Sequence, residues 1–193
     1  MILRSIILLM LLSSPLRAEI TIVNPELRES SDNFIVRAQF SYKLDKRVIG
    51  ALQNGIQMTF IAEYQIEEVT PLLQFSPPFF HSNREILHGE HSFSLSYRQF
   101  NNRYYLISLD NNSHGTYSTI EEAVDRMRLR NDKLTIDKSI LDRDKNYQVK
   151  IRASLDASSM PGLLKPYIYT PILWPEWKLD SGWHTIPIEA LKK

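Results

Sequence analysis

Three histidines near the middle of the chain come closest, by type and spacing, to a metal site. His81, His88 and His91 lie close together, with Glu85 and Glu90 among them. Neutral imidazole is the commonest nitrogen ligand of zinc and copper, so positions 88 and 91 could bind one ion. In a strand, however, residues three apart point to opposite faces, and structural sites usually have a tighter ligand set. We therefore expect residues 70–91 to form a solvated loop, and we predict neither a metal nor a cofactor.

The sequence carries no catalytic signature. It has no Gly-x-Ser-x-Gly elbow, no His-Glu-x-x-His pair and no glycine-rich phosphate loop, and it has only six glycines. The carboxylate pairs Glu67-Glu68 and Glu121-Glu122 are adjacent in the chain, so neither pair is spaced to face a substrate across a cleft. We predict that the protein is not an enzyme.

Two aromatic groups are candidates for binding. The C-terminal group consists of Trp174, Trp177, Trp183, Tyr167 and Tyr169. Such residues can anchor a partner, but a buried aromatic side chain covers about 150–250 Å², and the alternating pattern around them favours core packing.

The second aromatic group follows a diproline. Pro77, Pro78, Phe79 and Phe80 lie in a segment without periodicity, where two phenylalanines are hard to bury. We predict that these four residues form an interaction surface for a protein partner, with a lid as the alternative.

The balance of charge excludes a typical nucleic-acid-binding protein. The chain has 23 Lys and Arg against 22 Asp and Glu, and its one basic cluster is Arg126, Arg128, Arg130 and Lys133. Cations at the C-terminal end of a helix complement the helix dipole, so this cluster is expected to be a solvated helix end.

The first eighteen residues have the features of a secretory leader. Arg4 precedes an apolar run at residues 6–12, and Ala18 provides a small residue for cleavage. The run is shorter than the roughly 20 residues that span a bilayer. The absence of cysteine is compatible with export. We expect residues 1–18 to be a signal peptide and the protein to be periplasmic, without a transmembrane segment; the alternative is an N-terminal core element.

Alternation of apolar and polar residues dominates the rest of the chain and indicates strands. Residues 33–44 and 56–67 alternate over their whole length, and Asn101-Asn102 is expected to form a hairpin turn between residues 93–98 and 104–109. The later strands are expected at residues 134–136, 147–155, 167–170, 176–179 and 183–188. Helical spacing predicts short helices at residues 45–53 and 119–130, the second beginning with a capping box between Ser118 and Glu121.

One-sided strands with two short helices predict a mainly β fold. We expect residues 19–193 to form one β-rich domain, an antiparallel β-sandwich of immunoglobulin-like or similar type. An open β-barrel is the alternative.

Several motifs, taken in their order along the chain, resemble a known family. They lie at residues 51–56, at 95–98 and 103–105 across a hairpin, and at 120–123, 147–156, 160–161 and 177–183. Together they resemble an exported proteobacterial family known as domain of unknown function 4390. The resemblance implies an exported, mostly β domain without an established activity, and members are often encoded beside a membrane sensor kinase. The chain departs from the family at residues 66–73, where the family carries an Arg- and Trp-rich stretch.

These observations predict a periplasmic, non-catalytic domain that acts through protein contacts, with residues 70–91 as the contact region. The partner is expected to be an envelope protein, with a membrane sensor kinase as one possibility, and no nucleic acid is expected. The rival function is a carrier of a small apolar or lipid-like ligand. A metal-binding enzyme is the third.

Overall fold

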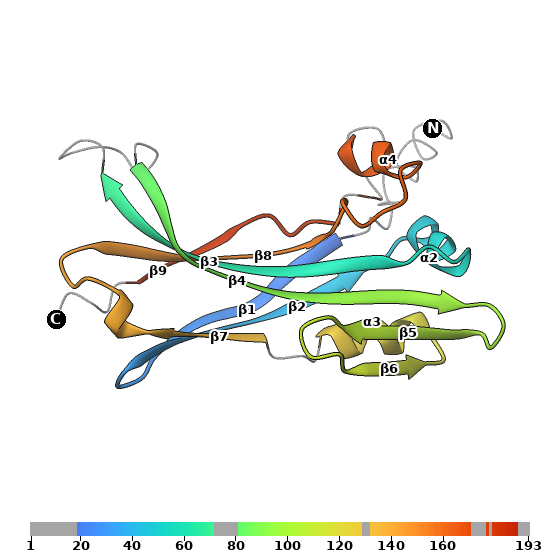
Figure 1. Ribbon diagram of the computed structural model, residues 1–193, viewed down its shortest axis with the longest axis horizontal. Coiled ribbons are helices and arrows are strands. Elements are labelled where there is room, and N and C mark those ends of the chain that lie inside the picture. Colours follow the sequence, from blue (N-terminus) through green and yellow to red (C-terminus); the bar gives the residue numbers. More distant parts are fainter. Residues whose placement is uncertain (1–18, 72–80, 129–131, 171–176, 178, 189–193) are drawn as a thin grey trace, which may run out of the picture.

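Two antiparallel sheets make up most of the computed structural model, which describes residues 19–71, 81–128, 132–170, 177 and 179–188 (Figure 1). The smaller sheet has the strand order β1-β2-β7, and the larger one has the order β6-β5-β4-β3-β8-β9. The smaller sheet contains β1 (Glu19–Glu29), β2 (Asn33–Lys43) and β7 (Asp132–Asp137). The larger sheet contains β3 (Met58–Pro71), β4 (His81–Arg98), β5 (Arg103–Ser108), β6 (His114–Tyr117), β8 (Asn146–Leu155) and β9 (His184–Ile188).

The predicted β-sandwich is confirmed, and the described strands do not form the alternative open barrel. Aromatic side chains from the inner faces of the two sheets meet edge to face, with 5.5 Å between the ring centres of Tyr42 and Phe60 and 6.5 Å between those of Phe40 and Tyr64. The predicted alternation produces this core. Its buried members on β2 and β3 are Phe34, Val36, Ala38, Phe40, Tyr42, Met58, Phe60, Ala62, Tyr64 and Ile66.

The helices are short. They are α2 (Lys46–Gln53), α3 (Ile120–Arg128) and α4 (Lys165–Tyr169), with one 3₁₀ turn, η1 (Lys138–Ile140). Helix α2 lies at one end of the sandwich, α3 packs against β5, β6 and β2, and α4 stands to one side of the strands (Figure 1). The two predicted helices correspond to α2 and α3. None of the helices among the described residues has the length and hydrophobicity that a membrane span requires.

The cap of α3 differs by one residue from the predicted capping box. Thr119 Oγ1 accepts a hydrogen bond from the Glu122 amide (3.2 Å), and Glu122 Oε2 accepts one from the Ser118 amide (2.9 Å). The pair is therefore Thr119 with Glu122, because the helix begins one residue later than predicted.

The strand predicted at residues 167–170 is wrong, since this segment belongs to α4 and the turn after it. Pro166 stands in the first turn of α4, where its fixed φ and missing amide hydrogen favour a helix. In the strand predicted at residues 176–179, Trp177 lies in a helical turn, while positions 176 and 178 lie outside the described residues.

The loop predicted at residues 70–91 is wrong for its second half. Residues 81–91 form the first part of β4 and pair with β3 from Pro71 to Ala62. A β-bulge interrupts this pairing between Ile66 and Glu67, leaving Ile86 of β4 without a partner. A bulge shifts the alternation of faces, which hides the period-two pattern in the sequence. Strand β1 was not predicted, and its own register shift lies between Val23 and Glu26.

Candidate functional site

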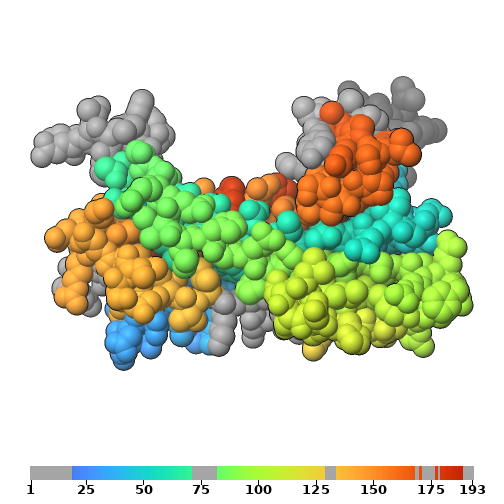
Figure 2. All heavy atoms as spheres, viewed as in Figure 1, coloured from blue at the N-terminus to red at the C-terminus, as the bar shows by residue number. Residues whose placement is uncertain are grey.

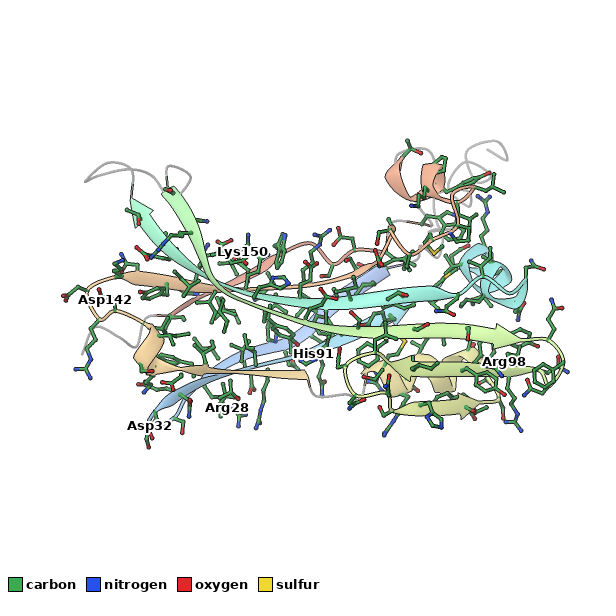
Figure 3. The ribbon with its side chains drawn as sticks, viewed as in Figure 1. Arg28, Asp32, His91, Arg98, Asp142 and Lys150 are labelled. Atoms are coloured by element: carbon green, nitrogen blue, oxygen red, sulfur yellow. The ribbon has the colours of Figure 1, made fainter. Side chains whose placement is uncertain are left out.

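The outer face of the six-stranded sheet carries a broad concave surface. Figure 2 shows the molecule hollowed between the end of the β3–β4 hairpin and the segment around α4, with β8 and β9 between them. In Figure 3, Lys150 lies on this side of the sheet and His91 on the side that faces β1 and β2. We call this surface the outer hollow. The residues that define it are Glu63, Glu67, Gln148, Lys150, Arg152, Asp180 and Trp183.

The register of β3 with β8 brings oppositely charged side chains onto this face. Glu63 is opposite Arg152, and Glu67 is opposite Gln148. Paired residues of an antiparallel sheet point to the same side, and their neighbours along each strand point into the core. The outward positions of β3 and β8 therefore form one ladder of charged and amide side chains.

Glu67 lies at the centre of the best-connected part of this ladder. Its side chain is largely buried, and it accepts hydrogen bonds from Gln148 Nε2 (2.8 Å), Lys150 Nζ (3.1 Å) and Asn83 Nδ2 (3.0 Å). A buried carboxylate is tolerated when it is paired and fully hydrogen-bonded, and here donors from β4 and β8 satisfy it. The three strands are thereby tied together through one side chain.

Arg152 forms the second connected part. Its Nε and Nη2 atoms donate to the two carboxylate oxygens of Asp180 at 3.0 and 2.7 Å, and its Nη1 lies 3.8 Å from Glu63 Oε2. The hydrogen bond to Asp180 raises the pKa of Arg152 further above its ordinary value. The planar guanidinium matches a carboxylate with two parallel hydrogen bonds, which fixes its orientation.

Trp183 lies against the two cations of the ladder. Lys150 Nζ is 4.8 Å and Arg152 Cζ is 5.6 Å from the centre of its ring, and the side chain keeps 36% of its surface exposed. Both distances are within the range of a cation–π interaction. Gly182 precedes it with φ +68°, a left-handed conformation that suits glycine and turns the chain toward β9. An aromatic side chain is thus held at the surface by charged neighbours.

The segment around α4, at one side of the outer hollow, exposes two large hydrophobic side chains. Leu163, in the turn before α4, is 88% exposed, and Tyr167 within the helix is 36% exposed. Exposed aliphatic and aromatic side chains grouped beside a polar surface are typical of contact sites.

The predicted interaction residues Pro77, Pro78, Phe79 and Phe80 lie outside the described residues, in the connection between β3 and β4. Their role stays a prediction. The two strands that this connection joins end at one side of the outer hollow (Figure 1).

The histidines are in a strand, and two of them point to opposite faces. His88 is exposed opposite Gln65, whereas His91 lies opposite the buried Ala62, with its Nδ1 3.0 Å from an oxygen of Asp110. The side chain of His81 is not among those described. Within the described residues, no group of three or more His, Cys, Asp or Glu side chains is arranged to hold a metal ion.

The C-terminal tryptophans have different environments. Trp177 is buried, as predicted from its size, whereas Trp183 and Tyr167 are partly exposed and the expectation of core packing is wrong for both. Trp174 lies outside the described residues. Sequence reasoning also missed Lys150 and Arg152, although their outward positions between buried residues of β8 were a usable signal.

The structure describes the side chains of two of the four residues in the predicted basic cluster. On α3, Arg126 is exposed and Arg128 pairs with Asp125 at 3.3 Å, as expected for a solvated helix end. Arg130 and the side chain of Lys133 are not among the described parts of the chain.

Comparison with known proteins places the chain in a family. Searches of curated proteins and of solved structures found no match. Residues 17–187, which include both sheets and the residues of the outer hollow, match the family model Domain of unknown function (DUF4390). The resemblance carried by the sequence motifs is thereby confirmed, and the chain belongs to the DUF4390 family.

Proposed function

We propose that the protein is exported to the periplasm and acts there without catalysis, by binding another envelope protein through the outer hollow. The observation that carries this proposal is Trp183, which is held partly exposed against Lys150 and Arg152 on a concave face. Tryptophan, tyrosine and arginine are the residue types enriched at the energetic centres of protein interfaces.

The charged side chains of the outer hollow are already held in place by one another, which supports a binding role. Glu67, Lys150, Arg152 and Asp180 are each engaged by a hydrogen bond or an ion pair before any partner arrives. Binding costs less conformational entropy when the contact side chains are already ordered. The charged ladder would therefore meet a partner as a largely rigid surface, with Trp183 as its aromatic anchor.

The apolar side chains beside the ladder supply the second part of an interface. Leu163 and Tyr167 belong to α4 and the turn before it, the segment that borders the outer hollow (Figure 2), and burying apolar area favours association. A ladder of both charge signs beside an apolar edge favours a protein partner over a nucleic acid, which would require an excess of positive charge. A membrane sensor kinase is the partner suggested by the family resemblance.

Site-specific photocrosslinking in the native envelope tests this proposal. A photoreactive amino acid at position 163 should give an adduct with one protein. The same amino acid at position 100 is the control. Phe100 is 81% exposed, but it lies in the turn between β4 and β5, at the tip of another hairpin, so no adduct is expected there. In the position-163 variant, Trp183→Ala should weaken the adduct.

Two outcomes of this experiment would contradict the proposal. Equal adducts at positions 163 and 100 would show nonspecific contact and overturn the assignment of the outer hollow. An adduct at position 163 that Trp183→Ala leaves unchanged would remove Trp183 from the interface. A thermal melt of each variant is the control for folding.

A further inference from the structure

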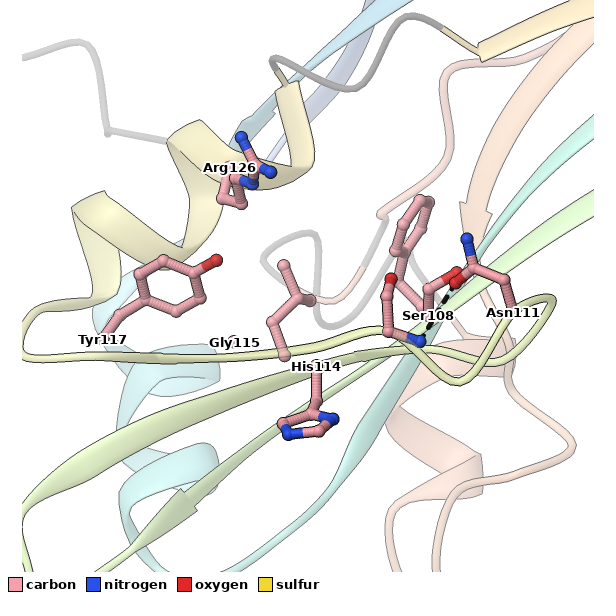
Figure 4. A pocket seen from close by; sticks show the side chains of 9 residues that line it. Ser108, Asn111, His114, Gly115, Tyr117 and Arg126 are labelled. Atoms are coloured by element: carbon pink, nitrogen blue, oxygen red, sulfur yellow. Dashed lines mark hydrogen bonds between the residues drawn. The ribbon is translucent and has the colours of Figure 1, made fainter.

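A cavity of about 440 Å³ lies between the β5–β6 hairpin and α3, away from the outer hollow. It is lined by Phe93, Leu106, Ser108, Asn111, Ser113, His114, Gly115, Tyr117 and Arg126. Figure 4 shows Ser108, Asn111 and Tyr117 on the side of the hairpin that faces α3, with Arg126 projecting from the helix above them. The His114 ring points to the opposite side of the strand. The cavity lies at the lower end of the volumes typical of small-molecule sites.

Gly115 makes room for the Tyr117 ring beside the cavity. It is opposite Leu106 on the inner face of the hairpin, where any other residue would carry a Cβ atom. A Cβ atom at this position would collide with the hydroxyl of Tyr117, which folds over the glycine. Gly115 therefore allows the Tyr117 ring to lie across the inner face of the hairpin, where it forms part of the wall of the cavity.

Ser108 is the strongest sign of a ligand. Its side chain is only 3% exposed and lines the cavity, and its Oγ atom has no hydrogen-bond partner among the described residues. Its backbone is fixed, because the Ser108 amide donates to the carbonyl oxygen of Ser113 at 2.8 Å. A buried hydroxyl without a partner is unfavourable, and unsatisfied groups of this kind in folded proteins call for an explanation such as a bound molecule.

The remaining polar groups can all donate hydrogen bonds, and the charged one is a cation. Arg126 has no acidic partner among the described side chains, whereas Arg128 on the same helix pairs with Asp125. Asn111 Oδ1 already accepts a hydrogen bond from the Ser113 amide at 3.0 Å, which leaves its NH₂ group as a donor. No carboxylate is among the residues that line the cavity. Phe93 and Leu106 provide an apolar wall beside these donors.

We propose that this cavity binds a small organic carboxylate whose charge is met by Arg126 and whose apolar body lies on Phe93 and Leu106. The hydroxyl of Ser108, and the donors of Asn111 and Tyr117, supply the hydrogen bonds that position the ligand. One guanidinium beside an apolar wall suits a monoanion with a hydrocarbon part better than a phosphate, which would call for several cationic or amide donors.

The test is a titration of the purified protein with benzoate, followed by NMR of the Gly115 amide. Arg126→Gln should weaken benzoate binding by about tenfold or more, because a hydrogen bond to a charged group is lost. Arg128→Gln is the matched control: it makes the same change on the same helix outside the cavity, and it should bind as the original chain does. Ser108→Ala should also weaken binding while leaving the protein at least as stable.

Two further ligands decide the chemical class. Benzamide has the same ring without the charge, and inorganic phosphate has charge without an apolar body; both should bind more weakly than benzoate. Equal binding of benzamide, tighter binding of phosphate, no binding of benzoate, or an unchanged affinity in Arg126→Gln would each overturn the proposal. Both arginines are exposed, so folding of the two glutamine variants is expected and is checked by their spectra.

Discussion

Arg152 on β8 and Asp180, which precedes β9, are joined by two parallel hydrogen bonds of 3.0 and 2.7 Å. The pair lies beside an isolated β-bridge between Ser154 and Asp180. Arg152 thus connects β8 to Asp180, where the turn that contains Trp183 begins. The arrangement of the outer hollow depends on this connection.

Replacing Arg152 by methionine should destabilise the protein by about 1–2 kcal/mol, because two charge-assisted hydrogen bonds are lost from a partly exposed site. Urea unfolding measures the change. Arg28→Met is the control. Arg28 pairs with Glu26 at 2.8 Å, but both side chains are about half exposed, so the expected change is within about 0.5 kcal/mol. An Arg152 variant as stable as the control would contradict the structural role of the pair.

The stability of the protein should fall in acid partly because of Glu68. Arg84 and Lys145 lie 2.6 and 3.0 Å from its carboxylate oxygens, and the hydrogen bond from Arg84 is the main cause of the lowered pKa of Glu68. A carboxyl group with a lower pKa in the folded state stabilises the fold above its unfolded pKa, and this contribution is lost as the pH falls through the folded pKa.

Glu68→Gln should therefore reduce the loss of stability between neutral pH and the range below the ordinary glutamate pKa. Thermal melts across that range measure the slope. Glu29→Gln removes a more exposed carboxylate that pairs with Lys138, and it is the matched control. Identical pH profiles for Glu68→Gln and the original chain would show that Glu68 contributes nothing to the acid response.

Deleting residues 76–80 should leave the fold intact but abolish co-purification with the envelope partner. The deletion removes the predicted interaction residues Pro77, Pro78, Phe79 and Phe80 and keeps the paired parts of β3 and β4. Quantitative affinity purification measures the partner, and circular dichroism checks the sheets. An unchanged yield of partner would remove this segment from the interface and leave the outer hollow as the tested surface.

Export should remove residues 1–18. The protein recovered from the periplasmic fraction is expected to begin at Glu19, since Ala18 completes the predicted cleavage site. N-terminal sequencing of that fraction gives the result directly. A protein that retains Met1 and fractionates with the cytoplasm would exclude both the leader and the periplasmic function.

The strands with uninterrupted alternation were predictable, because that pattern is local. The apolar positions of β2 and β8 are every second residue, and each set is buried in the sandwich. The turn at Asn101-Asn102 was equally predictable from the sequence, and Asn102 has the positive φ, 53°, that such a turn requires. The first half of β4 could not be predicted from the sequence, because a bulge at Ile86 and a glycine at position 89 interrupt the alternation of apolar and polar residues.

The sequence by itself determined the family, the sheet-forming segments and the two predicted helices, since each depends on residues that are neighbours along the chain. The tertiary structure alone decided which residues of different strands meet. Strand register places Glu67 beside Lys150 and Gly115 opposite Leu106, and the turn at Gly182 places Trp183 on two cations. These contacts join distant segments, and the hydrogen bonds between strands that set them leave no periodic trace in the sequence.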